Sequence, residues 1–147
     1  MLSNVLTEGL QFIHISAAEE DEELLALQDQ ARALFEDARI QLHSNYDEFM
    51  VLVDGSRHVR AALALSVTED EELAYEFSFV TDQSFRRQRL AHRLLMEAIK
   101  FVRAQGKELD LPTWLEAYVV NPEAVLPLLK SLGFELSGKY WRLKVVD

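Results

Sequence analysis

The chain has 147 residues, of which 49% are hydrophobic, and a formal net charge of −10. This length and apolar content are enough for one compact domain with its own core. There is no cysteine, which excludes disulfides, thiolate metal ligands and a cysteine nucleophile. The four histidines show no ligand spacing, so no metal site is predicted.

Location and partners are predicted from the same global features. The N-terminal sequence lacks the basic and apolar regions of a signal peptide, and no apolar run approaches the roughly 20 residues that a membrane span requires. We therefore expect a single domain over residues 1–147, located in the cytoplasm, with no membrane partner. The acidic surface would repel nucleic acid and attract basic amines or basic protein segments.

The first half of the chain predicts one strand, a helical region and three further strands. Residues 11–16 alternate in polarity, and residues 20–42 follow helical spacing, as one long helix or two short ones, after an acidic run that favours a helix start. Residues 49–53, 59–67 and 73–80 predict antiparallel strands joined by turns.

The second half predicts a long helix, a strand, a short helix and a hairpin. The long helix begins at residue 84 or 86, and Gly106 is expected to stop it. A right-handed crossover would place a strand at residues 115–120 parallel to the strand at 73–80. The short helix that follows should kink or restart at Pro127, and residues 134–146 form the closing hairpin.

Four arginines lie within residues 86–93, at the start of the long helix. The first turn of a helix exposes backbone N–H groups and carries about half a positive charge, so each cation there costs roughly 0.3 to 1 kcal/mol. A bound anion reverses this cost, because amides and guanidinium groups then point at one phosphate. The cluster indicates a phosphate site. The alternative is a solvated helix end that offsets the acidic runs.

The run RRQRLA at residues 86–91 resembles the pyrophosphate-binding signature R/Q-x-x-G-x-G/A of the GCN5-related N-acetyltransferases, the GNAT family. The downstream order of elements is also similar: a strand that ends in Asn121 precedes an apolar segment that closes on Gly133 and Phe134. The resemblance covers residues 49–146. It implies a mixed α/β (α+β) fold with a mostly antiparallel central sheet and helices on both faces.

The resemblance also implies acetyl-CoA as cosubstrate, without a metal. Its pyrophosphate would bind Arg86, Arg87, Gln88, Arg89, Leu90 and Ala91. Its pantetheine arm would pair with backbone groups of Phe79, Val80 and Thr81, and Asn121 would contact the arm from the other side. An amine on a small molecule or a protein would attack the thioester directly, and a backbone N–H near Val80 would stabilise the oxyanion. A homodimer is compatible with the sequence.

Two residues depart from the family pattern. Arg89 replaces the first glycine of the signature, and Leu129 replaces the tyrosine that many members use to protonate the leaving thiolate. We expect Arg89 to be helical and to turn its guanidinium outward onto the anion; the alternative is that its side chain obstructs the approach of the amides to phosphate and weakens the site. The departures leave a second hypothesis open: a catalytically degenerate module that binds acyl-CoA or a protein partner as a regulator. A third is a purely structural interaction domain.

The catalytic candidates are Glu76 and Tyr118. Glu76 lies in an apolar strand on the same face as Ser78, and burial would raise the pKa of such a carboxylate toward that of a general base. The alternative is an ion pair between Glu76 and an arginine such as Arg60. Tyr118 shares one face of the later strand with Glu116, and both are candidate acid or base groups, although a tyrosine in a strand more often packs in the core.

Overall fold

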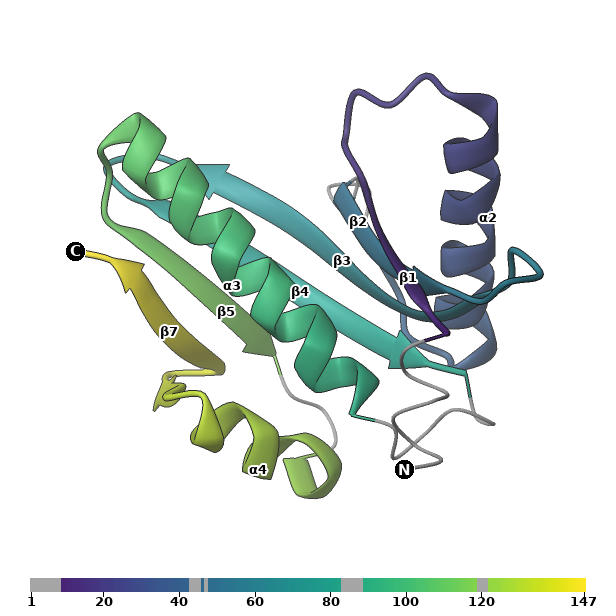
Figure 1. Ribbon diagram of the computed structural model, residues 1–147. Coiled ribbons are helices and arrows are strands. Elements are labelled where there is room, and N and C mark those ends of the chain that lie inside the picture. The colour runs from purple at the N-terminus through teal and green to yellow at the C-terminus, as the bar shows by residue number, and fades with distance from the viewer. Residues whose placement is uncertain (1–8, 43–45, 47, 83–88, 119–121) are drawn as a thin grey trace. The chain divides into compact units, whose positions relative to one another are not determined.

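The computed structural model describes residues 9–42, 46, 48–82, 89–118 and 122–147, with the side chains of residues 118 and 122–124 left undescribed. Seven strands and three helices lie within these residues (Figure 1). They are β1 (Gln11–Ile15), α2 (Glu22–Asp37), β2 (Glu48–Val53), β3 (Val59–Glu69), β4 (Leu73–Thr81), α3 (Leu90–Leu109), β5 (Thr113–Tyr118), α4 (Pro122–Ser131), β6 (Glu135–Ser137) and β7 (Tyr140–Val146).

The strands form one sheet in the order β1-β2-β3-β4-β5-β7-β6. β1 pairs antiparallel with β2, and β2 with β3. β4 pairs parallel with β5, as the crossover rule predicts, and β7 pairs antiparallel with both β5 and β6. The predicted fold class, a mixed fold with a mostly antiparallel sheet, is confirmed.

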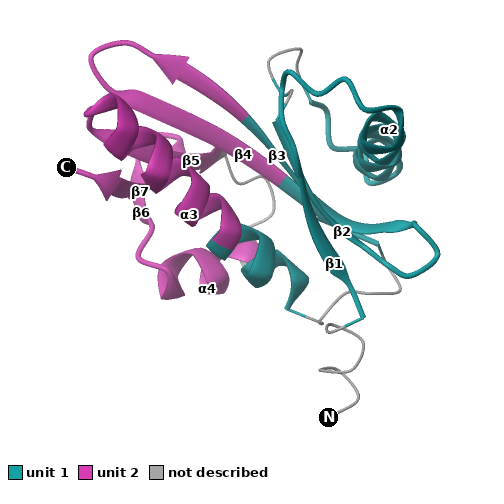
Figure 2. Ribbon diagram, turned by 45° about the horizontal axis from the view of Figure 1, so that its top comes forward, with its two compact units in different colours: residues 1–65, 79–96 teal, residues 66–78, 97–147 magenta. Residues whose placement is uncertain are grey.

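The chain divides into two compact units (Figure 2). Unit 1 contains Met1–Leu65 and Phe79–Met96, and unit 2 contains Ser66–Ser78 and Glu97–Asp147. β3, β4 and α3 each contribute residues to both units. The expectation of a single domain over residues 1–147 stays a prediction. None of the described helices is long and apolar enough to cross a membrane.

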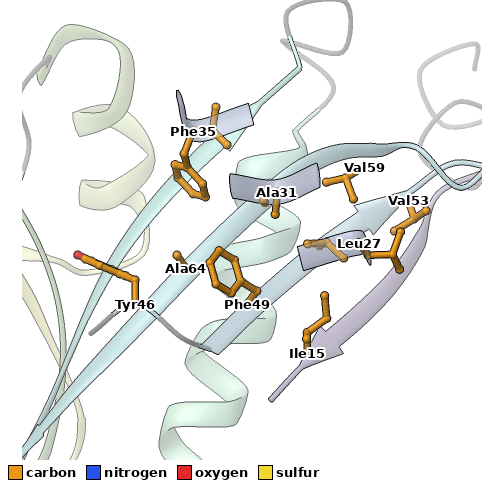
Figure 3. Close-up of a cluster of buried hydrophobic side chains, with 12 residues drawn as sticks. Ile15, Leu27, Ala31, Phe35, Tyr46, Phe49, Val53, Val59 and Ala64 are labelled. Atoms are coloured by element: carbon orange, nitrogen blue, oxygen red, sulfur yellow. The ribbon is translucent and has the colours of Figure 1, made fainter. Parts of the chain in front are cut away.

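Unit 1 has its core between α2 and the strands β1, β2 and β3 (Figure 3). Asp21 caps α2, because its carboxylate accepts hydrogen bonds from the N–H groups of Glu23 and Leu24. The buried side chains of the helix, spaced by one turn, lie on one stripe that faces the sheet. They are Leu27, Ala31 and Phe35.

α2 is shorter than the predicted helical region at residues 20–42. Arg39 takes a left-handed conformation, with φ 59°. The N–H of Ile40 then donates to the carbonyl oxygen of Phe35, at 2.9 Å, which closes the last turn and ends the helix at Asp37. Arginine at this position carries no sequence signal for a helix end, and the predicted helix is too long for that reason.

A β-bulge interrupts the pairing of β2 with β3. Leu52 lies opposite Ala61, and the next pair is Val53 with Val59, so Arg60 is an extra residue in β3. The bulge resets the alternation of side chains. Val59 therefore joins the buried cluster under α2, whereas an unbroken strand would turn it to the opposite face.

Unit 2 packs its part of α3, and a residue that follows α4, against β4. The rings of Tyr75 in β4 and Phe101 in α3 meet edge to face with 6.1 Å between centroids. Phe77 and Phe134 meet in the same way at 5.9 Å. α4 continues through Pro127, the position at which the sequence predicts a kink or restart.

Gly106 lies inside α3, and the prediction that it stops the helix is wrong. α3 continues to Leu109, and Asp110 ends it with φ 56°. The N–H of Leu111 donates to the carbonyl oxygen of Gly106 at 3.1 Å, and that of Asp110 to Lys107 at 3.3 Å, the bonding pattern of a Schellman motif. Gly106 has a packing role: a Cβ there would overlap the hydroxyl of Thr113.

We predict that Gly106→Ala lowers the free energy of unfolding in urea. The added methyl would lie 2.8 Å from Cβ of Thr113 and 2.9 Å from Cγ2 of Val146. Overpacking costs roughly 1 to 3 kcal/mol, which outweighs the gain of about 1 kcal/mol that alanine gives inside a helix. Gly55→Ala is the control, because a Cβ at Gly55 meets nothing within 4 Å. A more stable Gly106→Ala variant would contradict the packing role.

Candidate functional site

The start of α3 in unit 1 presents backbone amides without partners in the helix. The first bond of the helix runs from the N–H of Arg93 to the carbonyl oxygen of Arg89, at 3.1 Å. The N–H groups of Leu90, Ala91 and His92 therefore have no intrahelical acceptor. The first turn also contains no acidic residue. These features suit an anion, and Leu90 and Ala91 are the last two positions of the predicted pyrophosphate signature.

Arg89 is not helical, which corrects our expectation. It lies immediately before α3 with φ 60° and its side chain is exposed. Left-handed backbone is unfavourable for residues with a Cβ and easy for glycine, and this is the position at which the family signature has its first glycine. Arg89 thus adopts, at the position of that glycine, a backbone conformation that glycine reaches without strain, and it carries a guanidinium there. Arg86, Arg87 and Gln88, the rest of the predicted anion site, lie outside the described residues.

Arg93 is the arginine of the cluster that lies within the helix. One of its guanidinium nitrogens, Nη1, donates to the carbonyl oxygen of Leu10 at 3.2 Å, just before β1. Leu10 is buried. Arg93 therefore joins the start of α3 to the segment that enters β1, and it is not merely a solvated cation at a helix end.

The last residues of β4 precede this site in the chain. Val80 is buried in the core of unit 1, and Phe79 and Thr81 are half-buried. The N–H of Asp82 donates to the carbonyl oxygen of Arg60 at 2.7 Å. The residues predicted to pair with a pantetheine arm thus form the end of β4. The hydrogen bond from Asp82 connects this end to Arg60, the bulge residue of β3.

Arg60 forms an ion pair with each of two carboxylates. Its Nε lies 2.9 Å from Oδ2 of Asp54, and its Nη1 lies 2.9 Å from Oδ2 of Asp82. The N–H of His58, followed by the guanidinium of Arg60 and the N–H of Ser56, lowers the pKa of Asp54, against the opposing effect of burial. Asp82 and then Asp54 raise the pKa of Arg60. The sequence suggested Arg60 as an ion-pair partner for Glu76, and it did not predict the ion pairs of Arg60 with Asp54 and Asp82.

Glu76 lies in unit 2, on the face of β4 opposite to Tyr75 and Phe77. Its Cα pairs with that of Glu116 in the parallel register of β4 and β5. Two glutamates side by side on one face repel each other unless a cation is near. Both are half-buried.

Arg142 in β7 provides that cation. Its Nε lies 2.8 Å from Oε2 of Glu116, in an ion pair whose angle does not make a directed hydrogen bond. The guanidinium also lies 3.9 Å from the ring centroid of Trp114 and 3.7 Å from a carboxylate oxygen of Glu72. Glu72 accepts a hydrogen bond from the indole N–H of Trp114 at 3.1 Å. Alternation along β7 puts Arg142 and Lys144 on one face, but the sequence does not show which carboxylates Arg142 meets, because Glu72 and Glu116 lie on other strands and turns far along the chain.

Three other predicted positions can be located in part. Tyr118 is the last residue of β5, and its Cα pairs with that of Tyr140. Asn121 lies outside the described residues. Leu129 is fully buried in α4, so the position of the family's tyrosine carries an apolar core residue. Within the described parts of the chain, no group of three or more metal-ligating side chains gathers.

The acetyltransferase (GNAT) family model matches residues 11–134. The chain therefore belongs to the GNAT family of acetyltransferases. No curated protein matches it.

Solved structures with low sequence identity share the fold. One is AtaT in complex with acetyl-methionyl-tRNAfMet, with a TM-score of 0.63, 14% identity, and coverage of 92% of this chain and 94% of that one. AtaTR bound to AcCoA has a TM-score of 0.62 and 14% identity over 94% of each chain. The ribosomal-protein-S18-alanine N-acetyltransferase from Escherichia coli has a TM-score of 0.59 and 18% identity, covering 93% and 96%.

We predict that Arg89→Gly raises the free energy of unfolding by roughly 0.5 to 1 kcal/mol. Glycine removes the cost of left-handed backbone, about 1 to 2 kcal/mol, and gives part of it back as entropy of the unfolded chain. Arg89→Ala is the matched control, because it removes the same charge but keeps a Cβ at φ 60°. Urea denaturation of the two variants measures the difference. Equal stabilities would show that Arg89 is not strained.

Proposed function

We propose that this protein is an N-acetyltransferase that transfers the acetyl group of acetyl-CoA to an amine. The observation that carries the proposal is the start of α3: three amides without intrahelical acceptors follow Arg89, which has left-handed backbone at the position of the motif's first glycine. Family membership supports the same reaction. The solved neighbour bound to AcCoA supports the cosubstrate.

In this proposal the pyrophosphate of acetyl-CoA binds at the N-terminus of α3. The amides of Leu90 and Ala91 donate to it, and the helix dipole favours its charge. The side chains of residues 86–89 add charge-assisted hydrogen bonds. Backbone groups of Phe79, Val80 and Thr81 pair with the pantetheine arm, and Asn121 contacts the arm. No metal takes part.

The reaction is a direct attack of the amine on the thioester. Glu76 takes the proton from the ammonium group, directly or through water, and Tyr118 is the candidate acid for the leaving thiolate. The N–H of a residue near Val80 stabilises the tetrahedral oxyanion. Holding both reactants together supplies about 7 to 11 kcal/mol of the barrier, so the buried Leu129 at the family's tyrosine position is compatible with turnover.

The acceptor we propose is a cationic amine on a small molecule or a protein, as the net charge of −10 favours. The solved neighbours include one in complex with acetyl-methionyl-tRNAfMet and one whose acceptor is an alanine of ribosomal protein S18. We propose the protein or small-molecule class and not nucleic acid, because an acidic surface opposes phosphate backbones. The buried Leu129 favours a second candidate function, a regulator that binds acyl-CoA or a protein partner without turnover.

Calorimetry with CoA and acetyl-CoA, followed by an assay of thiol release on a panel of amines, separates these functions. Binding with thiol release establishes the enzyme. Binding without release on any amine supports the regulator. A protein that binds neither CoA nor acetyl-CoA refutes the enzyme and the acyl-CoA-binding regulator, and leaves a module that binds a protein partner or a purely structural interaction domain.

We predict that Arg86→Glu with Arg87→Glu weakens CoA binding by more than about 100-fold. Each charge-assisted hydrogen bond is worth about 1.5 to 3 kcal/mol, and two are replaced by repulsion. The matched control is Arg39→Glu with Arg57→Glu, which changes the net charge equally at two exposed arginines of unit 1. Equal losses in the two double variants would mean that net charge, and not this site, controls affinity.

We predict that Glu76→Gln removes the acid limb of the pH–rate profile of kcat/KM. A general base must be deprotonated, so activity falls as the pH drops below its pKa in the free enzyme. CoA affinity should stay at the wild-type value. Glu71→Gln, in the exposed turn before β4, is the control and should keep the limb. An acid limb retained in Glu76→Gln would assign the base to another residue.

A further inference from the structure

Arg60 connects two fixed points of unit 1 through one guanidinium. Nε binds the carboxylate of Asp54, and Nη1 binds that of Asp82, each at 2.9 Å. The exposed fractions of the three side chains are 27%, 21% and 25%. These values place the network between surface pairs, which contribute little, and fully buried pairs, which cost desolvation.

Asp54 is the rigid end of this network. It lies at the turn between β2 and β3, where its carboxylate accepts hydrogen bonds from the N–H groups of Ser56 and His58 at 2.9 and 3.0 Å. Its own N–H donates to the carbonyl oxygen of His58 at 3.0 Å. The hydrogen bonds of the turn therefore hold Asp54 in place independently of Arg60.

Asp82 is the end that the network holds in place. It directly follows Thr81, the last residue of β4, and it contacts Arg60 twice: its N–H donates to the carbonyl oxygen at 2.7 Å, and its carboxylate accepts from Nη1. The bulge makes this arrangement available, because Arg60 is the extra residue of β3 and lies outside the regular pairing with β2. A lysine at position 60 has a single ammonium in place of the planar fork and does not reproduce it.

We propose that Arg60 is a positioning residue for acyl-CoA, which it serves by fixing the end of β4 through Asp82. The inference rests on the proposed function, in which Phe79, Val80 and Thr81 offer backbone groups to the pantetheine arm. Arg60 touches no reacting atom. It sets the position and direction of the strand end, so that the cost of ordering this backbone is met before the ligand binds.

The test is CoA affinity, by calorimetry, in Arg60→Gln, Asp82→Asn, Arg60→Lys and the double variant Arg60→Gln with Asp82→Asn. We expect each single change to weaken CoA binding about tenfold, or 1.4 kcal/mol. The double variant should lose no more than Arg60→Gln alone, because both changes break the same contact. Circular dichroism confirms that each protein is folded at the temperature of the titration.

Glu48→Gln is the matched control. Glu48 forms a hydrogen-bonded pair of similar burial in the same unit, with its carboxylate 2.6 Å from Nε2 of His14 and 2.9 Å from the backbone nitrogen of Ala17. This variant should lose stability and keep wild-type affinity for CoA. Folded Arg60 and Asp82 variants that lose stability but also keep wild-type affinity would overturn the positioning role. A wild-type protein that does not bind CoA would instead refute the proposed function itself.

Discussion

The parallel pairing of β4 with β5 is the constraint on which the rest of the arrangement depends. Parallel neighbours cannot be joined by a tight turn, so the chain needs a long crossover, and α3 is that crossover. The helix packs on the sheet as far as its last turns: Gly106, close to the end of α3, lies against Thr113 at the start of β5 with no room for a side chain. The start of α3 follows the end of β4 in the chain, and the amides of its first turn have no acceptor within the helix.

Much of the fold was predictable because it depends on local patterns. Alternation identified the strands, helical spacing identified α2 and α3, and the crossover rule gave the parallel pair. The errors have a common origin in backbone conformation. Arg39, Arg89 and Asp110 all have φ near 60°; arginine gives no signal for left-handed backbone, and aspartate gives a much weaker one than glycine. The ends of α2 and α3, and the start of α3, were misplaced for this reason.

Within the candidate site, the sequence predicted only the part that a known motif covers. The signature at residues 86–91 includes Leu90 and Ala91, the first two residues of α3, but the sequence began the helix four or more residues too early. The partners of Arg60 and Arg142 were not predictable, because they depend on a β-bulge and on strand pairings between distant segments. A one-residue bulge reverses the face of every residue beyond it. Alternation alone therefore cannot tell which carboxylate a strand arginine will reach.

The position of Trp114, stacked under Arg142, and that of the second tryptophan determine which part of the protein fluorescence can follow in solution. The chain has two tryptophans, Trp114 and Trp141, and both belong to unit 2. Each lies near a cation, Trp114 beside Arg142 and Lys144, and Trp141 beside Lys130. Intrinsic tryptophan fluorescence therefore monitors unit 2 alone, whereas circular dichroism follows both units. Coincident unfolding curves from the two signals would mean that the units melt as one cooperative body, and separate curves would mean that they do not.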